Sequence, residues 1–118
     1  MNKDWVQTTK DLSSALKDLR GGAPAVMQGF SAIAQAALKT KALDTKTKEL
    51  IALAIGVATR CDGCIAFHAE AAVKQGASRE EVLETMGMAI YMGAGPSVMY
   101  AAQALEAFDQ FQDLKNSV

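Results

Sequence analysis

The feature that most constrains the fold is an apolar run from Leu50 to Ala58, which leaves no polar face on a helix. Asp44 precedes it where an N-cap would begin a helix, and the helical pattern continues to about Thr59. A helix without a polar face is buried on all sides. A chain of 118 residues achieves this most easily when a second copy covers one side, so we predict a homo-oligomer.

The rest of the sequence predicts an all-α fold. Alanine, the best helix former and a poor strand former, is the commonest residue, and there are only 2 prolines. Apolar spacing and capping signals divide the chain into six helical segments joined by short connections. We expect them at about residues 4–20, 24–38, 44–59, 62–75, 78–92 and 96–113, within a single domain that spans residues 1–118.

Several segment boundaries carry specific signals. Pro24 suits a first helical turn, Gly76 suits the C′ position, and Ser78 with Glu81 fits a capping box. Pro96, after a Gly-Ala-Gly stretch, is expected to start the sixth segment. Four methionines of the last two segments are expected to fill the core: Met86, Met88, Met92 and Met99.

Composition and charge exclude several classes of function. The net charge of −1 argues against a nucleic-acid surface and against a polybasic membrane anchor. The longest apolar run is too short to span a membrane, and Met1 is not followed by the apolar core of a signal peptide. The 2 cysteines are too few for a secreted disulfide scaffold. We therefore expect a soluble protein of the reducing cytoplasm, with neither nucleic acid nor membrane as partner.

The chemistry-bearing residues lie between Glu49 and His68. Cys61 and Cys64 are three residues apart, and His68 follows Cys64 by four, so all three share one face of a helix that starts near Asp62. A helix N-terminus stabilises a thiolate, and a neighbouring imidazole can take the thiol proton. A second thiol one turn away can convert a sulfenic acid into a disulfide. The spacing therefore favours redox chemistry, with Cys64 as attacking thiol because His68 is in reach.

Blander interpretations of the same residues stay open at this point. The cysteines could be inert buried thiols, Asp62 could be only an N-cap, and Glu49 could be a solvated first-turn carboxylate. If the two helices form an antiparallel hairpin, Glu49 and His68 are offset by about 7.5 Å along it, which does not establish contact. A zinc site with Glu49, Cys61, Cys64 and His68 as ligands is less favoured, because a second ligand pair at typical spacing is absent. We therefore expect no metal.

The spacing Glu49, Cys61-Asp62-Gly63-Cys64, His68 resembles the motif of alkylhydroperoxidase D-like proteins, in the carboxymuconolactone decarboxylase family. The flanking stretches 43–51, 93–96 and 104–108 are similar as well, so the likeness extends over residues 24–111, within an expected family core of 24–113. It implies an orthogonal bundle of helices that assembles into trimers or hexamers. In this chain, Gly63 stands where alkylhydroperoxidase D itself has a histidine, and the helical core occurs once where the full-length enzyme has two copies.

The resemblance also implies an activity. It is that of a thiol-dependent peroxidase or disulfide oxidoreductase that reduces alkyl hydroperoxides and needs no metal or bound organic cofactor. Cys64 would attack the peroxide, Cys61 would close the disulfide, and His68 with Glu49 would relay the proton. An external dithiol, either a lipoyl group or a thioredoxin-like protein, would restore the thiols. The alternatives are a cofactor-free carboxymuconolactone-type decarboxylase, whose branch lacks the cysteine pair, and a non-enzymatic thiol redox sensor.

Overall fold

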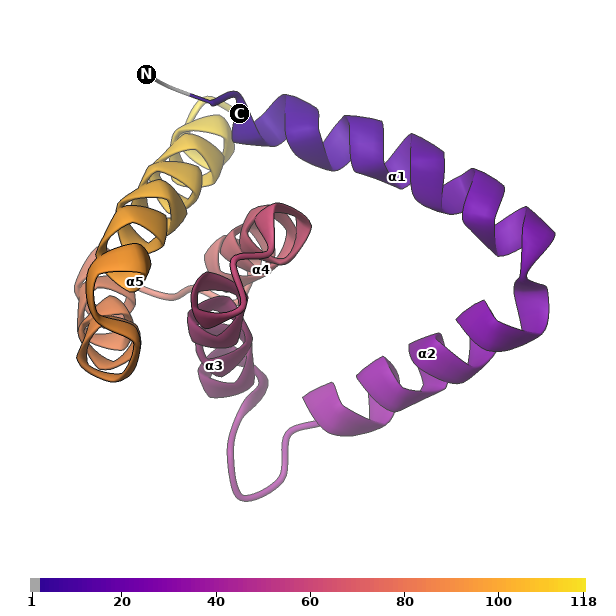
Figure 1. Cartoon of the computed structure of the whole chain (residues 1–118), viewed down its shortest axis with the longest axis horizontal. Helices are drawn as coiled ribbons and strands as arrows, with labels where there is room; N and C mark the ends of the chain where they lie inside the picture. The colour runs from indigo at the N-terminus through magenta and orange to yellow at the C-terminus, as the bar shows by residue number, and fades with distance from the viewer. Residues whose placement is uncertain (1–2) are drawn as a thin grey trace.

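Five helices and no strand make up residues 3–118, the part of the chain that this computed structural model describes. The helices are α1 (Trp5–Gly22), α2 (Pro24–Leu38), α3 (Thr45–Ala58), α4 (Asp62–Lys74) and α5 (Arg79–Asn116). The all-α prediction is confirmed. Helices α3 and α4 lie side by side with α5 against them. Helix α1 contacts α4 and α5, and α2 turns back toward α3, so that α1 and α2 together form a bent arm (Figure 1).

The fifth and sixth expected helices are joined in α5, so the structure does not show the count of six. Ala94 has φ 55° and ψ −140°, a non-helical conformation at which the chain folds back. Arg79 at the start of α5 forms a salt bridge with Asp109 near the end of the same helix, with Nε 3.0 Å from Oδ1. The expected break therefore exists as a sharp kink, and Pro96 lies within α5 rather than at the start of a separate helix.

Most of the expected capping signals are confirmed. The Asp44 side chain accepts a hydrogen bond from the Thr47 backbone N–H at the start of α3. Ser78 and Glu81 form the capping box of α5, and Gly76 has a positive φ of 80° after α4. The predicted end of the first helix near residue 20 was wrong, because α1 continues through Gly22. Ala23 separates α1 from α2 because a residue before proline is pushed out of the helical region.

The core lies between α3, α4 and α5, with one anchor from α1. Trp5 is fully buried, and its indole Nε1 donates to Glu106 Oε1 at 2.9 Å. Apolar residues of the other three helices complete the core, including Leu53, Val57, Ile65, Ala69, Val73, Val82, Met86, Phe108 and Phe111. Of the four methionines expected there, only Met86 is buried. The prediction was wrong for Met88, Met92 and Met99, which lie on the outside of α5.

Apolar faces of α2 and α3 remain uncovered in the single chain, in addition to the exposed methionines of α5. No residue of α2 is buried, although the helix is strongly apolar, and Phe30 and Ile33 are 64% and 67% exposed. Ile51 and Ile55 of α3 are also exposed, so the apolar run of α3 is buried on one side only. Among the described residues, no helix is both long and apolar enough to cross a membrane.

Candidate functional site

The turn between α3 and α4 brings the two helices into an antiparallel pair. The Cys61 backbone N–H reaches back to the Gly56 carbonyl at 3.0 Å, and Arg60 between the helices has φ 56°. This six-to-one hydrogen bond with a left-handed residue is the Schellman arrangement that ends many helices. Because α4 starts at Asp62 directly afterwards, Cys61 lies at the end of one helix and at the beginning of the next.

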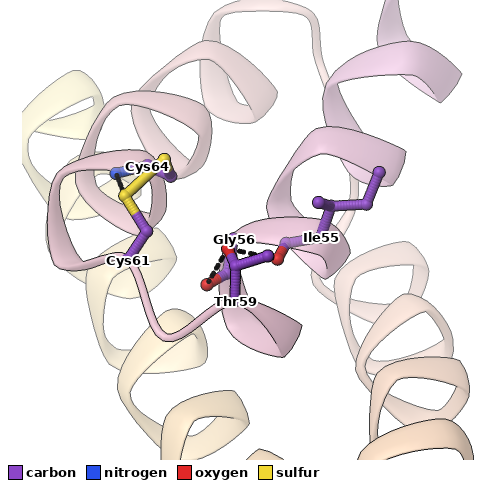
Figure 2. The surroundings of a disulfide bond; sticks show 5 residues. All are labelled: Ile55, Gly56, Thr59, Cys61 and Cys64. Atoms are coloured by element: carbon purple, nitrogen blue, oxygen red, sulfur yellow. Dashed lines mark hydrogen bonds between the residues drawn. A yellow bond between two sulfur atoms is a disulfide. The ribbon is translucent and has the colours of Figure 1, made fainter.

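Cys61 is the N-cap of α4 and is bonded to Cys64 through a disulfide. Its Sγ accepts a hydrogen bond from the Cys64 backbone N–H at 3.1 Å, drawn as a dashed line in Figure 2. The cysteine Cα atoms are 5.2 Å apart, as the first turn of a helix allows. Asp62 is therefore not the N-cap. It is the first helical residue, and its carboxylate pairs with the Lys3 ammonium.

Gly56 of α3 allows the close approach of α4 at the disulfide. A Cβ placed on Gly56 would lie 3.1 Å from the Cys64 Cβ and 3.5 Å from the Cys64 carbonyl carbon. Figure 2 shows Gly56 beside the turn that carries the cysteines. Sequence reasoning counted Gly56 only as part of the apolar run. A glycine inside a strongly apolar helix is the signal that could have indicated this close packing.

Glu49 and His68 meet directly between α3 and α4. His68 Nδ1 lies 2.7 Å from Glu49 Oε1, so the offset along the hairpin does not keep them apart. Glu49 is only 6% exposed, whereas the His68 side chain is 33% exposed. A carboxylate that accepts a hydrogen bond from the Nδ1–H of an imidazole leaves Nε2 free to take or give a proton. The pair thus provides an oriented base one helical turn after Cys64.

An apolar groove of about 420 Å³ opens beside His68, between α2 and α3. Its walls are mostly hydrophobic, and His68 and Lys48 are its two ionisable residues. The other lining residues are Phe30, Ala34, Ala37, Leu38, Ile51, Ala52 and Ile55. The sequence alone did not predict this groove, because a groove between two helices depends on how they cross. The arrangement can admit an apolar molecule to the imidazole.

A sequence model of the carboxymuconolactone decarboxylase family matches residues 24–107, which contain Glu49, both cysteines and His68. The chain belongs to this family. The match starts at α2 and ends within α5, so α1 lies outside it.

Solved structures and relatives of the family agree with this membership. A carboxymuconolactone decarboxylase family protein from Legionella pneumophila is 57% identical, with a TM-score of 0.89 over 92% of this chain and 96% of that one. A family protein from Thermotoga maritima, described as possibly involved in antioxidative response, is 26% identical with a TM-score of 0.78 over 98% and 95%. An uncharacterized protein from Haemophilus influenzae is 43% identical over 92% of this chain and 96% of its own length.

One departure from the alkylhydroperoxidase D pattern has a visible structural counterpart. A Cβ on Gly63 would lie 3.1 Å from the Leu12 Cδ1 of α1. Helix α1 therefore packs against position 63, where the motif of alkylhydroperoxidase D has a histidine. Over residues 3–118, no group of three or more His, Cys, Asp or Glu side chains is arranged to hold a metal ion.

Proposed function

We propose that this chain is a thiol-dependent peroxidase or disulfide oxidoreductase that reduces alkyl hydroperoxides. One observation carries the proposal: the Cys61–Cys64 disulfide lies one helical turn from a His68 imidazole held by the buried Glu49. The apolar groove beside His68 supports an alkyl rather than a strongly polar substrate. The antioxidative role suggested for the Thermotoga maritima protein is consistent with it.

The proposed reaction moves two electrons from the thiols to the peroxide. The Cys64 thiolate attacks one oxygen of the hydroperoxide, the O–O bond breaks, and the alcohol leaves with a proton from His68. Cys64 is then a sulfenic acid. The Cys61 thiolate attacks its sulfur, closing the disulfide and releasing the hydroxyl oxygen as water. An external dithiol of the lipoyl or thioredoxin type then returns two electrons and two protons, which suits a reducing cytoplasm.

We also propose that the working form is a homo-oligomer, a trimer or hexamer as the family resemblance implies. The exposed apolar faces of α2 and α3 support this, because each would be covered by another copy.

The test is an intact-mass and free-thiol measurement on reduced protein after a slight excess of an organic hydroperoxide. Wild-type protein should lose both thiols to an intramolecular disulfide, and Cys61→Ser should trap a sulfenic acid on Cys64. His68→Ala should slow this oxidation by about 10²–10⁴-fold, the usual contribution of general acid–base catalysis. Thiols that survive the peroxide unchanged would exclude the peroxidase.

The same preparation separates the alternatives. Turnover of a carboxymuconolactone by the Cys61→Ser/Cys64→Ser double variant would instead support the decarboxylase that the family is named for. Oxidation that stays stoichiometric in the presence of excess dithiol and peroxide would support a redox sensor.

A further inference from the structure

Arg60 has a backbone conformation that its side chain does not favour. Its φ of 56° is left-handed, at the C′ position after α3, where glycine is the common residue. The same chain shows the common solution at the end of α4, where Gly76 has φ 80° and the Ala77 N–H bonds the Ala72 carbonyl at 3.0 Å. Two equivalent turns thus carry glycine in one case and arginine in the other. A side chain kept in a disfavoured conformation beside a reactive pair indicates a use for that side chain.

The charge of Arg60 is uncompensated within the described chain. Arg60 is exposed, and it makes no ion pair with any residue from 3 to 118. The acidic group nearest to it in the sequence, Asp62, is already paired with Lys3. The residue before Cys61 in the chain is therefore an exposed arginine, whose guanidinium carries five donors and suits a planar anion such as a carboxylate.

Arg60 also lies outside the groove that leads to His68. That groove is lined on α3 by residues from Lys48 to Ile55, and neither Arg60 nor Cys61 contributes to it. A peroxide bound there would have no contact with the guanidinium. A molecule that reaches the disulfide at the turn between α3 and α4 would instead approach next to Arg60, which precedes Cys61 in the chain.

We propose that Arg60 recognises an anionic group carried next to the dithiol of the reductant that reopens the Cys61–Cys64 disulfide. This inference rests on the proposed function, because it requires a disulfide that cycles. One thiolate of the dithiol attacks a protein sulfur, the S–S bond breaks, and the released cysteine takes up a proton. The second thiolate then displaces the other cysteine from the mixed disulfide. Two electrons and two protons pass to the protein, and the reductant leaves as its own disulfide.

The test compares two dithiols that differ only in charge. Dihydrolipoate carries a carboxylate, and dihydrolipoamide carries an amide in its place. Stopped-flow reduction of the oxidised protein should be faster with dihydrolipoate for the wild type. The rate ratio should fall about two- to fivefold in Arg60→Gly, as expected when one exposed ion pair is lost, and it should also fall for the wild type at high salt.

The stability of Arg60→Gly provides the independent readout. Glycine relieves the left-handed conformation, so the variant should keep or raise its Tm while it loses the preference for the anionic dithiol. A merely structural residue would lose stability instead. Lys74→Gln is the matched control, because it removes the same charge from the opposite end of α4 and should leave the rate ratio unchanged.

Each other outcome overturns the proposal. An unchanged ratio in Arg60→Gly would mean that Arg60 does not recognise the anion. An equal slowing with both dithiols would assign Arg60 to stabilising a cysteine thiolate instead. If the wild-type disulfide resists both dithiols and a thioredoxin-like protein, the cycling disulfide of the proposed function fails together with this inference. A disulfide that is reduced with an unchanged ratio leaves the proposed function intact.

Discussion

At the scale of single residues, Glu49 and Gly56 place the reactive groups from one helix. They are two turns apart on the same face of α3, and each contacts a different part of α4. Glu49 bonds the His68 imidazole, while Gly56 lets the Cys64 backbone approach closely. Because both contacts cross the same helix pair, a change that separates α3 from α4 should disturb the imidazole and the cysteines together.

Gly56→Ala should lower the free energy of unfolding and slow disulfide formation. The added methyl group meets the Cys64 Cβ at 3.1 Å, an overpacking cost of about 1–3 kcal/mol that exceeds the helix-propensity gain of about 0.5–1 kcal/mol. The matched control is Gly87→Ala in α5, where nothing lies within 4 Å of the new Cβ, so stability should rise by about 0.5–1 kcal/mol. Urea unfolding measures both variants, and a Gly56→Ala protein as stable as Gly87→Ala would contradict the close packing.

Glu49→Gln should slow thiol oxidation by about 10–100-fold without unfolding the protein. The amide keeps the shape of the carboxylate but loses the charge that orients the His68 proton, and removal of such an orienting partner typically costs that much activity. Peroxide-dependent loss of free thiols measures the rate. Glu84→Gln, an exposed carboxylate of α5, is the control that should oxidise at the wild-type rate. Equal rates in the two variants would exclude Glu49 from the proposed proton relay.

The sequence predicted the local part of this site but not the part that spans two helices. Cys61, Cys64 and His68 are placed together by helical spacing alone, which is why their neighbourhood could be expected. The contact of Glu49 with His68 depends on where α3 and α4 cross, and no spacing within one helix encodes that position. Cys61 as the N-cap, in place of Asp62, likewise depends on the close turn that follows α3.

At the scale of elements, the N-terminus of α5 is fastened to α3. The Glu81 side chain accepts from the Ser78 backbone at 2.8 Å, and its other oxygen lies 2.9 Å from Lys46 Nζ of α3. These contacts lower the pKa of Glu81, chiefly through the Ser78 backbone hydrogen bond and then through Lys46. The capping box was predictable from residues three apart, whereas the partner on α3 was not.

Glu81→Gln should destabilise the protein at neutral pH but not in acid. The amide can still accept from the Ser78 N–H, so the variant removes only the charge. A carboxylate whose pKa is lowered on folding contributes stability above its ordinary pKa of 4.5, and this contribution is lost as the pH falls through the folded value. Thermal unfolding at several pH values should therefore show a Tm gap at pH 7 that narrows and then closes as the pH falls below 4.5. A gap that persists in acid would show that the charge is not responsible.

At the scale of the whole molecule, the arm formed by α1 and α2 lacks the burial that usually holds a helix in place. Trp5 fastens the start of α1 to α5, and α1 also contacts α4, but α2 buries no residue. Isolated helices of this length are marginal in water. The apolar run of α3 indicated in the sequence that one side of this helix would need a partner. The sequence did not show that α2 and the methionines of α5 are exposed as well. In the single chain, the apolar residues of these helices point outward. The hydrophobic pattern of one helix does not tell whether its apolar face packs on the core or faces solvent.

A homo-oligomer would bury the exposed apolar faces of α2, α3 and α5. A charge placed on the apolar face of α2 should therefore weaken the assembly. Analytical ultracentrifugation of the wild type should give a mass that is a multiple of 12.5 kDa at micromolar concentration. Ile33→Glu places a carboxylate on an exposed apolar position, so it costs a single copy nothing in packing but disfavours burial against a partner. It should shift the protein toward smaller species and lower its Tm, whereas Gln35→Glu, on the same helix, should keep the wild-type mass. A wild-type monomer would instead require the apolar face of α2 to meet a different partner.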